Sequence, residues 1–442
     1  MYAYIYTYIH VIYISIILKL IFMQTEITID VAGFRQVLNQ LKGAISPKTP
    51  LPILQCVKLS FDRQAEVFRL TGSNSELWLT VDCATTTTDA DGNADTQPCV
   101  HLLKEDPKEP FCDVCLPYAP LREAFSLLPA SRRCTVILKQ KGDVRTCTID
   151  YQDGAMDVPY QDALEFPDAP AIVTPEAPRE GTDAVCRFQI GASDLLGPVI
   201  QSRACVAADE LRPVMGAVCM DCSVDSVVIA ASDGHRLYKQ VIECPGYMKH
   251  VGFAADGSAK LLVPKSAMAS LIAAFGGSGT LTVTADTRRL MLQMGGATLN
   301  MAQIEGNYPN YNSVIPADNP YKVQISRESL KMALRCVQLS SDGTTNLAIM
   351  RSDGQSFIVE ANNDVEGRQG SERVAVQETD AFLPQGFKIG MKLSNVIDML
   401  DMLDEDSVCL YFSDQSHPIL LRNESQKLQG KTLLVMPMLV NV

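Results

Sequence analysis

Two pairs of cysteines are the first residues in this sequence whose types and spacing could support chemistry. Cys112/Cys115 and Cys219/Cys222 each have the C-x-x-C spacing that binds zinc when two such pairs come together. Residues 217–222 have the pattern of a strand, and residues three apart on a strand point to opposite faces of the sheet. The cysteines could form a zinc site or could be small apolar residues that pack in the core. The strand pattern favours packing.

A second candidate for chemistry is the turn-like segment Asp233-Gly234-His235-Arg236. A metal-dependent hydrolase could use Asp233, His235 and a cysteine pair, because carboxylate, imidazole and thiolate all bind metals. However, the chain has five histidines and none clusters with His235. It also has no phosphate-binding loop, dinucleotide-binding glycine motif, H-E-x-x-H or G-x-S-x-G. We therefore predict a protein without a catalytic site or cofactor, and the hydrolase is the alternative.

The composition is that of an acidic globular protein with reduced thiols. Of the 442 residues, 47% are hydrophobic and 20% are charged, and this length suits two to four domains. The 14 cysteines are scattered through a chain far larger than a disulfide-stapled module, which predicts a cytoplasmic location. The formal net charge of −13 argues against tight, sequence-independent DNA binding, since such binding depends on Lys and Arg.

Residues 1–22 are almost wholly apolar. They are long enough to span a bilayer at about 1.5 Å per residue, but they lack the basic region and cleavage site of a signal peptide. Met23 follows at once and opens an ordinary domain, so we interpret residues 1–22 as the product of a mis-assigned start codon. A membrane anchor, and with it an anchored repeat adhesin, is the alternative.

One pattern occurs three times along the chain: a short strand, a polar cap residue, and a helix with apolar residues at spacings of three and four. A second pattern, a helix followed by alternating strands, occurs once in each third of the chain. The first pattern covers residues 27–41, 188–200 and 323–337, and the second covers 115–138, 262–284 and 389–412. Ser193 and Ser326 are expected N-caps. These matches predict an α+β fold of three similar domains, each built from two helix-plus-strands units.

The repeats and two Pro-containing stretches divide the chain into parts. We predict an extension at 1–22, a first domain at 23–170, a linker at 171–185, a second domain at 186–310 and a third domain at 311–442. The Thr- and Asp-rich segment 85–96 is expected to be a polar loop inserted in the first domain. Pro198 should kink the first helix of the second domain or delay its start.

The polar faces of the repeated helices carry cations that could form a locally positive lining in an acidic protein. These residues are Arg35, Lys42, Arg203, Lys331 and Arg335. A solvated helix face is the alternative interpretation. The recurrence of Asp398, Asp401 and Asp404 along the last helix argues against a uniform positive charge.

Four short motifs follow one another along the chain. Residues 49–54 read T-P-L-P-I-L and residues 231–237 read A-S-D-G-H-R-L. Residues 305–316 read E-G-N-Y-P-N-Y…V-I-P and residues 435–438 read V-M-P-M. In this order they resemble the motifs of the bacterial DNA polymerase III beta subunit, the beta sliding clamp, whose first two read T-L-P-I-L and A-T-D-G-H-R-L. The resemblance therefore covers the chain from Met23 to Val442.

The resemblance implies a DNA sliding clamp, a non-catalytic subunit that gives the replicative DNA polymerase its processivity. Two protomers would join head to tail as a closed ring of six domains, with helices lining the hole and sheets outside. Such a ring holds duplex DNA by enclosure and without reading its sequence, so an acidic exterior and weak contacts suffice. The implied partners are double-stranded DNA, the polymerase subunit, the clamp loader, other proteins with clamp-binding motifs and a second copy of the chain, but no membrane.

In that family, partner peptides dock in an apolar groove between the second and third domains. The matching positions here are Ser232, Gly234, His235, Arg236, Leu237, Pro309, Val314, Ile315, Met436, Pro437, Met438, Leu439 and Val440. Adaptable Met and aliphatic walls with a few polar anchors suit the capture of varied peptides. Ser313 stands where some members have Arg, and the tail 439–442 is longer and less basic than usual. The peptide preference of the groove therefore stays open.

The resemblance also places DNA contacts and a subunit joint. Lys48 and Arg212 match basic positions beside the hole. Met156 and Val158 match apolar contacts at the first-domain edge of the joint. For residues 435–438, an edge strand that only completes the core of the third domain is the alternative interpretation.

Overall fold

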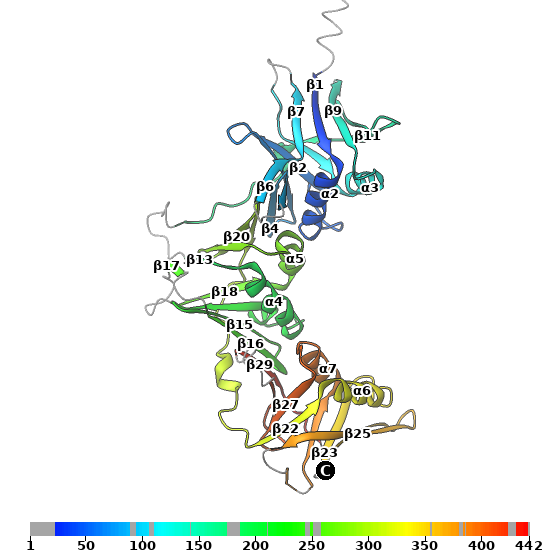
Figure 1. Cartoon of the computed structure of the whole chain (residues 1–442), viewed down its shortest axis with the longest axis vertical. Coiled ribbons are helices and arrows are strands. Elements are labelled where there is room, and N and C mark those ends of the chain that lie inside the picture. The colour runs from blue at the N-terminus through cyan, green and yellow to red at the C-terminus, as the bar shows by residue number, and fades with distance from the viewer. Residues whose placement is uncertain are drawn as a thin grey trace, which may run out of the picture. The chain divides into compact units, whose positions relative to one another are not determined.

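A computed structural model describes most of the chain, as residues 23–88, 94–105, 110–141, 143–174, 186–209, 211–243, 248–250, 258–353, 356–379, 383–384, 386–422 and 430–440. Strands predominate over short helices, so the predicted α+β class is confirmed (Figure 1). Two compact units are present. Unit 1 holds the described residues up to Ile172 with Ser266–Thr284 and Arg289–Ala302, and unit 2 holds Val173–Lys265, Ala285–Arg288 and the residues from Gln303 onward. The three-domain boundaries stay a prediction, and the extension 1–22 lies outside the described residues.

Unit 1 contains a five-stranded antiparallel sheet in the order β11-β10-β9-β1-β7. Its strands are β11 (Ala155–Pro159), β10 (Val144–Asp150), β9 (Arg133–Lys141), β1 (Met23–Asp30) and β7 (Val100–Lys104). Side chains alternate between the two faces of a strand, and this places Ile27 and Ile29 of β1 in the core. β11 and β7 are the two edge strands of this sheet.

A second sheet of unit 1 has the order β12-β8-β2-β3-β4-β21-β20-β19. Its strands are β12 (Gln161–Asp162), β8 (Val114–Pro117), β2 (Cys56–Asp62), β3 (Val67–Ser73), β4 (Leu77–Asp82), β21 (Ala297–Ala302), β20 (Arg289–Met294) and β19 (Thr280–Ala285). The prediction of a polar loop at 85–96 is wrong for the residues of this segment that the structure describes, because β5 (Ala84–Thr88) and β6 (Ala94–Pro98) pair as a hairpin. The β-branched threonines of this segment favour a strand.

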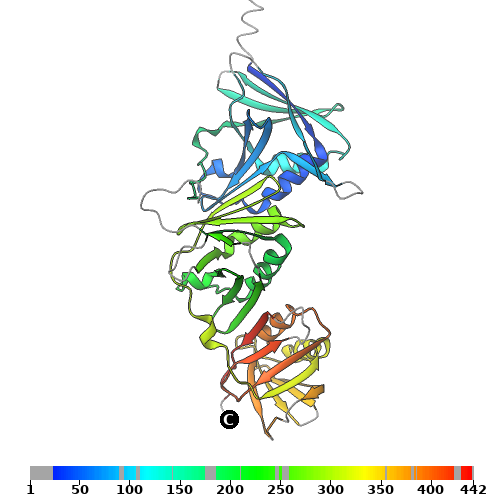
Figure 2. The ribbon, with the colours of Figure 1, turned by 60° about the vertical axis from the view of Figure 1, so that its left-hand side comes forward.

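The helices of unit 1 are α2 (Val31–Gln40), α3 (Tyr118–Leu127) and α5 (Met268–Phe275), all at positions that the apolar spacing predicts. The carboxylate of Asp30 caps α2 by accepting the backbone N–H of Gly33 at 2.9 Å. α2 and α3 lie side by side (Figures 1 and 2), with the ring centroids of Phe34 and Phe125 4.7 Å apart. The guanidinium of Arg35 donates to the carbonyl oxygens of Phe125, at 3.0 Å, and Leu128, so it caps the end of α3.

The chain just before the predicted linker is held against the second sheet of unit 1. The indole N–H of Trp78 donates to the carbonyl oxygen of Pro167 at 2.9 Å, and the amide of Asn300 donates to that of Pro170 at 2.8 Å. Arg289 connects the two anchors, since its guanidinium carbon lies 5.2 Å from the Trp78 ring and its Nε donates to Asn300. Residues 175–185 of the predicted linker lie outside the described residues.

Unit 2 is built on a twelve-stranded sheet in the order β18-β14-β15-β16-β29-β28-β27-β22-β25-β24-β23-β26. Its strands are β18 (Ala259–Pro264), β14 (Ala217–Cys222), β15 (Ser226–Ser232), β16 (Arg236–Glu243), β29 (Lys431–Val435), β28 (Ile419–Arg422), β27 (Ser407–Phe412), β22 (Tyr321–Ser326), β25 (Arg368–Thr379), β24 (Ser356–Asn363), β23 (Leu347–Ser352) and β26 (Lys388–Lys392). β13 (Cys186–Gly191), which pairs with β17 (Met248–His250), also belongs to this unit.

The helices of unit 2 are α4 (Ala192–Ser202), α6 (Arg327–Gln338) and α7 (Leu393–Leu400). Ser326 caps α6 by accepting the backbone N–H of Ser329, as predicted. The expectation for Ser193 is wrong, because it lies inside α4 and Gly191 occupies the cap position. Pro198 is buried within α4 and does not delay its start, since the helix already begins at Ala192.

Candidate functional site

The C-terminal strand β29 connects the two halves of the twelve-stranded sheet. On one side it pairs with β16, with Arg236 opposite Val435 and Leu237 opposite Leu434. On the other side it pairs with β28, with Leu420 opposite Leu434. The predicted mid-chain motif and the C-terminal motif are therefore neighbours in space, although about two hundred residues of sequence separate them.

The turn from Ser232 to Arg236 is fixed by its own hydrogen bonds. The Asp233 carboxylate accepts the backbone N–H groups of His235 and Arg236 at 2.9 and 2.8 Å. The Ser232 hydroxyl donates to the carbonyl oxygen of Arg236 at 2.8 Å. Gly234 has a φ of +88°, a conformation that other residues rarely adopt. This turn directs the exposed His235 away from the sheet and holds Leu237 in the core.

The Arg236 guanidinium joins this turn to α7. It binds the carboxylate of Asp233 at 2.9–3.0 Å and that of Asp398 at 2.6 Å. Only 15% of the Arg236 side chain is exposed. Burial alone would lower the pKa of Arg236, but the two carboxylates outweigh burial and raise it. The arginine is therefore a permanently charged link between two parts of unit 2.

The segment after Glu305 forms a second wall beside the turn. Tyr308 and Tyr311 are buried in an apolar cluster with Leu237 and Leu434, and Ile315 packs against the same cluster. The Tyr308 hydroxyl accepts the backbone N–H of Ser232 at 2.9 Å, which ties this wall to the turn.

Two exposed apolar residues lie on this second wall. Pro309 is exposed, and 47% of the Val314 surface is exposed. The second wall therefore combines an ordered aromatic base with apolar groups open to a partner.

The tail after β29 is the third wall. The backbone N–H of Met436 donates to the carbonyl oxygen of His235 at 2.8 Å, and that of Met438 donates to the carbonyl oxygen of Gly390 at 2.9 Å. Met436 packs on the apolar cluster and Leu439 is 86% exposed. The structure thus brings together all three segments of the groove that the sequence predicts.

Three residues outside the predicted groove set hold these walls in place: Asp233, Asp398 and Gly390. A Cβ on Gly390 would overlap the carbonyl oxygen of Met438 and lie 2.5 Å from a methyl group of Val440. Glycine inside a strand often marks the close approach of another backbone, so Gly390 could have indicated from the sequence that another segment packs on β26. No sequence pattern indicates the Arg236–Asp398 ion pair, because the two residues are 162 positions apart.

The predicted DNA-facing residues fall into exposed and paired groups. Lys42, Lys48 and Arg203 are exposed. Arg35 instead caps α3. Arg212 is exposed but pairs with Asp209 at 2.8 Å.

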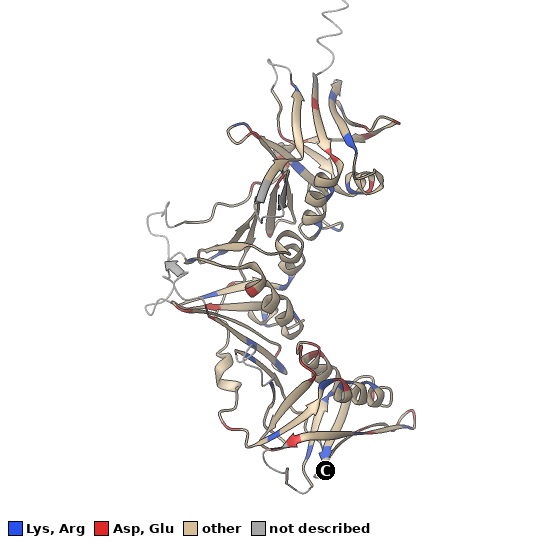
Figure 3. Cartoon of the chain, viewed as in Figure 1, with Lys and Arg blue, Asp and Glu red and all other residues tan. Residues whose placement is uncertain are grey.

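The two predicted cations of α6 lie against Asp401 at the C-terminal end of α7, and Figure 3 shows acidic positions on α7 beside basic positions on α6. Lys331 forms an ion pair with Asp401, and Arg335 lies 3.9 Å from the same carboxylate. Their positive charge is therefore partly compensated.

The predicted joint residues both lie on the edge strand β11. The Val158 side chain is only 3% exposed and packs inside unit 1, whereas Met156 is half-buried. Of the two, Met156 is the residue that this protomer still offers to a partner.

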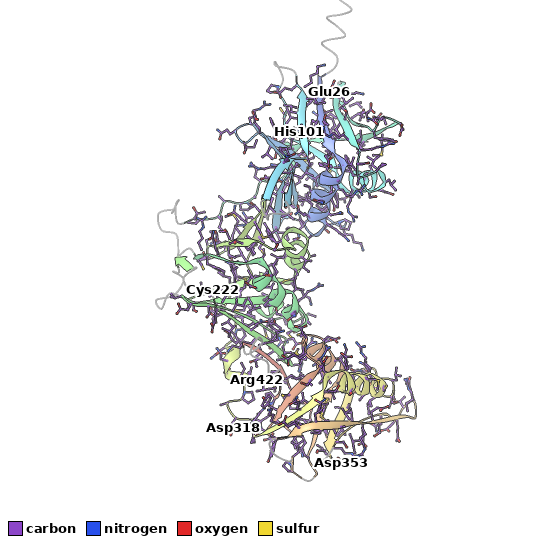
Figure 4. All side chains as sticks on the ribbon, in the orientation of Figure 1. Glu26, His101, Cys222, Asp318, Asp353 and Arg422 are labelled. Carbon is purple, nitrogen blue, oxygen red and sulfur yellow. The ribbon has the colours of Figure 1, made fainter. Side chains whose placement is uncertain are left out.

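The cysteine pairs do not come together as a metal site in the described part of the chain, where no three His, Cys, Asp or Glu residues are grouped to hold a metal. Cys219 and Cys222 are both fully buried, and Cys222 is labelled in Figure 4. A hydrogen bond with Cys186 and burial both raise the pKa of Cys222, and burial raises that of Cys219 to about 12. These neutral thiols fit the packing interpretation, and the hydrolase alternative has no supporting observation.

Comparison with known proteins agrees with this geometry. Residues 312–439 match the family model described as DNA polymerase III beta subunit, C-terminal domain. The beta sliding clamp of Synechocystis sp. is 23% identical over 420 residues, which cover 91% of this chain and 97% of that protein. The beta sliding clamp of Staphylococcus aureus (strain Mu50) is 22% identical over 93% of this chain and 98% of its own length. The C-terminal part of the chain thus matches the model of this family, and nearly the whole chain is similar to beta sliding clamps.

Solved structures show that the beta-subunit fold extends over the described chain. The DNA polymerase sliding clamp of Bacillus subtilis has a TM-score of 0.75 at 18% identity and covers 95% of this chain and 100% of its own. A sliding clamp from Bartonella birtlesii, bound to griselimycin, has a TM-score of 0.77 at 18% identity and covers 94% and 100% of the two chains. Among the described residues, no helix is long and apolar enough to cross a membrane.

Proposed function

We propose that this chain is a DNA sliding clamp, a non-catalytic cytoplasmic subunit that keeps the replicative DNA polymerase on duplex DNA. The observation that carries the proposal is the match to beta sliding clamps along nearly the whole length of both proteins. Two copies would close into a ring with the helices toward the hole. Enclosure does not require tight binding, which reconciles the net charge of −13 with a role on DNA.

A retention assay on circular DNA tests this function. Protein loaded by the clamp loader on nicked circular DNA should stay bound at high salt and should leave within minutes once the circle is cut, because only topology holds it. Lys48→Glu should slow loading at low salt and lower the salt dependence of binding to DNA by about one phosphate contact, but it should leave retention on closed circles unchanged. Arg133→Glu, an equal charge change at an exposed position of β9, is the matched control. Equal release from intact and cut circles would contradict enclosure.

The ring joint would use the free edge of β11 with Met156, facing the third domain of a second copy. On that domain, Met332 lies on α6 and is 66% exposed, and Leu339 lies at the C-terminal end of α6 and is 73% exposed. Both offer apolar surface of the kind that a joint buries. Head-to-tail pairing of two different surfaces closes a ring when the rotation between copies is 180°.

Met156→Glu should convert the dimer to monomer at micromolar concentration, because a buried unpaired carboxylate at the joint costs roughly 3 kcal/mol or more. Light scattering measures the mass. Leu211→Glu is the control, since Leu211 is 91% exposed and lies outside the proposed joint. Val158→Glu is a poor probe, because it would place charge inside unit 1. A Met156→Glu protein that remains dimeric would remove β11 from the joint.

The peptide groove would consist of the turn Ser232–Leu237, the segment from Pro309 to Ile315 and the tail Met436–Val440. Three observations support this assignment: the hydrogen bond between the turn and the tail, the apolar cluster beneath them, and the exposed apolar groups at its rim. The occupants would be extended peptides of the polymerase subunit and the clamp loader. Related clamps bound to griselimycin make that compound a suitable competitor in binding assays.

A further inference from the structure

Two buried cysteines face each other across the base of the hairpin β5–β6 in unit 1. The pairing of this hairpin ends with Ala84 opposite Pro98, so Cys83 and Cys99 occupy the next pair of positions. The backbone N–H of Cys99 donates to the carbonyl oxygen of Cys83 at 2.8 Å, so the two backbones are still side by side there. Opposite residues of an antiparallel pair have their Cα atoms roughly 4.5–5.5 Å apart.

This arrangement meets the requirements of a disulfide bond. A disulfide joins Cα atoms roughly 4.4–6.8 Å apart and does not form when the two Cβ atoms point away from each other. Cys83 is fully buried and Cys99 is 2% exposed, so both side chains point into unit 1. The strand registers of the described residues place no other two cysteines opposite each other. Strand pairing therefore aligns Cys83 with Cys99 in particular.

Burial keeps both thiols unreactive while the hairpin is closed. It raises the pKa of the Cys99 thiol to about 12. It also raises the pKa of the Cys83 thiol far above its usual range, and the nearby Cys99 adds to this rise. A thiolate, not a thiol, attacks a disulfide, so two neutral thiols closed to solvent do not react. Cys112 and Cys336, in contrast, are exposed.

The hairpin can open locally while the two larger sheets of unit 1 stay intact. β5 and β6 pair with each other and join no third strand in the described part of the chain. A single pair of strands is marginally stable at best. Thr96, Gln97 and Pro98, the last residues of β6, are exposed. The strands before and after the hairpin, β4 and β7, keep their own partners when it opens. Opening therefore gives a small reagent access to both sulfur atoms.

We propose that Cys83 and Cys99 are an oxidation site, which closes to a disulfide when a low-molecular-weight disulfide such as oxidised glutathione reacts with the open hairpin. One thiolate attacks oxidised glutathione, forms a mixed disulfide and releases one glutathione thiol. The second thiolate attacks the protein sulfur of the mixed disulfide, so the Cys83–Cys99 bond forms and a second glutathione thiol leaves. The protein loses two electrons and two protons, and the two glutathione molecules take them up.

The disulfide would tie together the two larger sheets of unit 1. Cys83 directly follows β4 of the second sheet, and Cys99 directly precedes β7 of the five-stranded sheet. The carbonyl oxygen of Cys99 also accepts the backbone N–H of Asp30, the cap residue of α2, at 2.8 Å. A cross-link across the hairpin restricts the unfolded chain and so stabilises the folded protein. Oxidation would therefore make this corner of unit 1 more resistant to opening.

Peptide mapping of the full chain tests the site. The folded protein is incubated with oxidised glutathione, and its remaining free thiols are blocked with N-ethylmaleimide. A protease then cuts at the aspartates of residues 89–95, which lie between the two cysteines, so that only a disulfide keeps the fragments together. Mass spectrometry should find a fragment pair linked through Cys83 and Cys99. It should form more slowly than the glutathione adducts of the exposed Cys112 and Cys336 and should disappear on reduction with dithiothreitol.

A comparison of oxidised and reduced protein tests the consequence for stability. Oxidation should raise the melting temperature by about 5 °C. Cys83→Ala should abolish both the linked fragments and this rise. Cys147→Ala is the matched control and should preserve both, because Cys147 is also a fully buried cysteine of unit 1 but lies opposite Leu138 and Val158. Each variant is compared with its own reduced form, so a lower starting stability does not affect the result.

Three outcomes would overturn the proposal. In the first, oxidised glutathione modifies Cys112 and Cys336 completely while Cys83 and Cys99 remain free thiols. In the second, either member of the pair links to a different cysteine. In the third, the linked fragments form but the melting temperature does not change, and the bond then does not tie the two sheets together.

Discussion

Removal of residues 438–442 will weaken the binding of polymerase-derived peptides by roughly a hundredfold or more and leave the dimer intact. The cut removes Met438, Leu439 and Val440, which would form one wall of the proposed groove. Buried apolar anchors of a peptide site each commonly contribute about 2 kcal/mol or more to the binding free energy. Loss of a wall removes several such contacts, so the affinity should fall by a large factor. β29 ends at Val435, before the cut, and the Met436–His235 hydrogen bond remains. The pairing of β29 with β16 and β28 in the sheet should therefore survive.

Gly390→Ala is a point variant that tests the same wall without shortening the chain. Its new methyl group would collide with the Met438 carbonyl group and with Val440, so the tail must leave its place on β26. We expect a loss of peptide affinity close to that of the truncation. Gly343→Ala is the matched control, because a Cβ there meets no atom within 4 Å.

A melting curve beside a fluorescence-anisotropy titration with a labelled peptide separates the groove from the alternative interpretation of 435–438 as an edge strand of the third-domain core. If the tail only completes that core, the truncated protein will lose thermal stability, dimer and peptide binding together. A folded, dimeric truncation that binds peptide with unchanged affinity would remove the tail from the site.

The features that could be predicted from the sequence are those that depend on nearby residues. The apolar residues at spacings of three and four in α2, α6 and α7 predict helices, because a helix that buries one face needs only that local spacing. Ser326 precedes its helix directly and caps it. In the Thr-rich segment 85–96 the polar composition predicts a loop, but the β-branched side chains favour the strands that form there.

The partners of charged side chains could not be predicted in the same way. The exposed-looking Arg35 on the polar face of α2 is used to cap α3, which follows some ninety residues later in the chain. Asp398 and Asp401 interrupt a basic pattern in the sequence, but in the fold they compensate Arg236 and Lys331. Which charges meet depends on how the sheets and helices pack, and composition carries no record of that.

Replacing Arg236 with leucine will cost roughly 3–5 kcal/mol of stability in unit 2 and will lower peptide affinity at the same time. The substitution leaves the partly buried carboxylate of Asp233 without its ion pair, and breaking one side of a buried charge network is strongly destabilising. The Asp398 side chain is 46% exposed, so leaving it without Arg236 adds less to the destabilisation. The turn Ser232–Leu237 would also lose its link to α7, and with it the fixed spacing between two walls of the groove.

A double-mutant cycle with Asp398→Asn separates the link from the general cost of the substitution. Asp398→Asn alone should cost about 1 kcal/mol, because Arg236 keeps Asp233 as a partner. Once Arg236 is leucine, Asp398→Asn should cost nothing further, and it should no longer change peptide affinity. Denaturant unfolding gives the stability of each variant, and anisotropy with the labelled peptide gives its affinity. Additive effects of the two substitutions on both quantities would show that Arg236 and Asp398 act independently, and the proposed link between the turn and α7 would then be wrong.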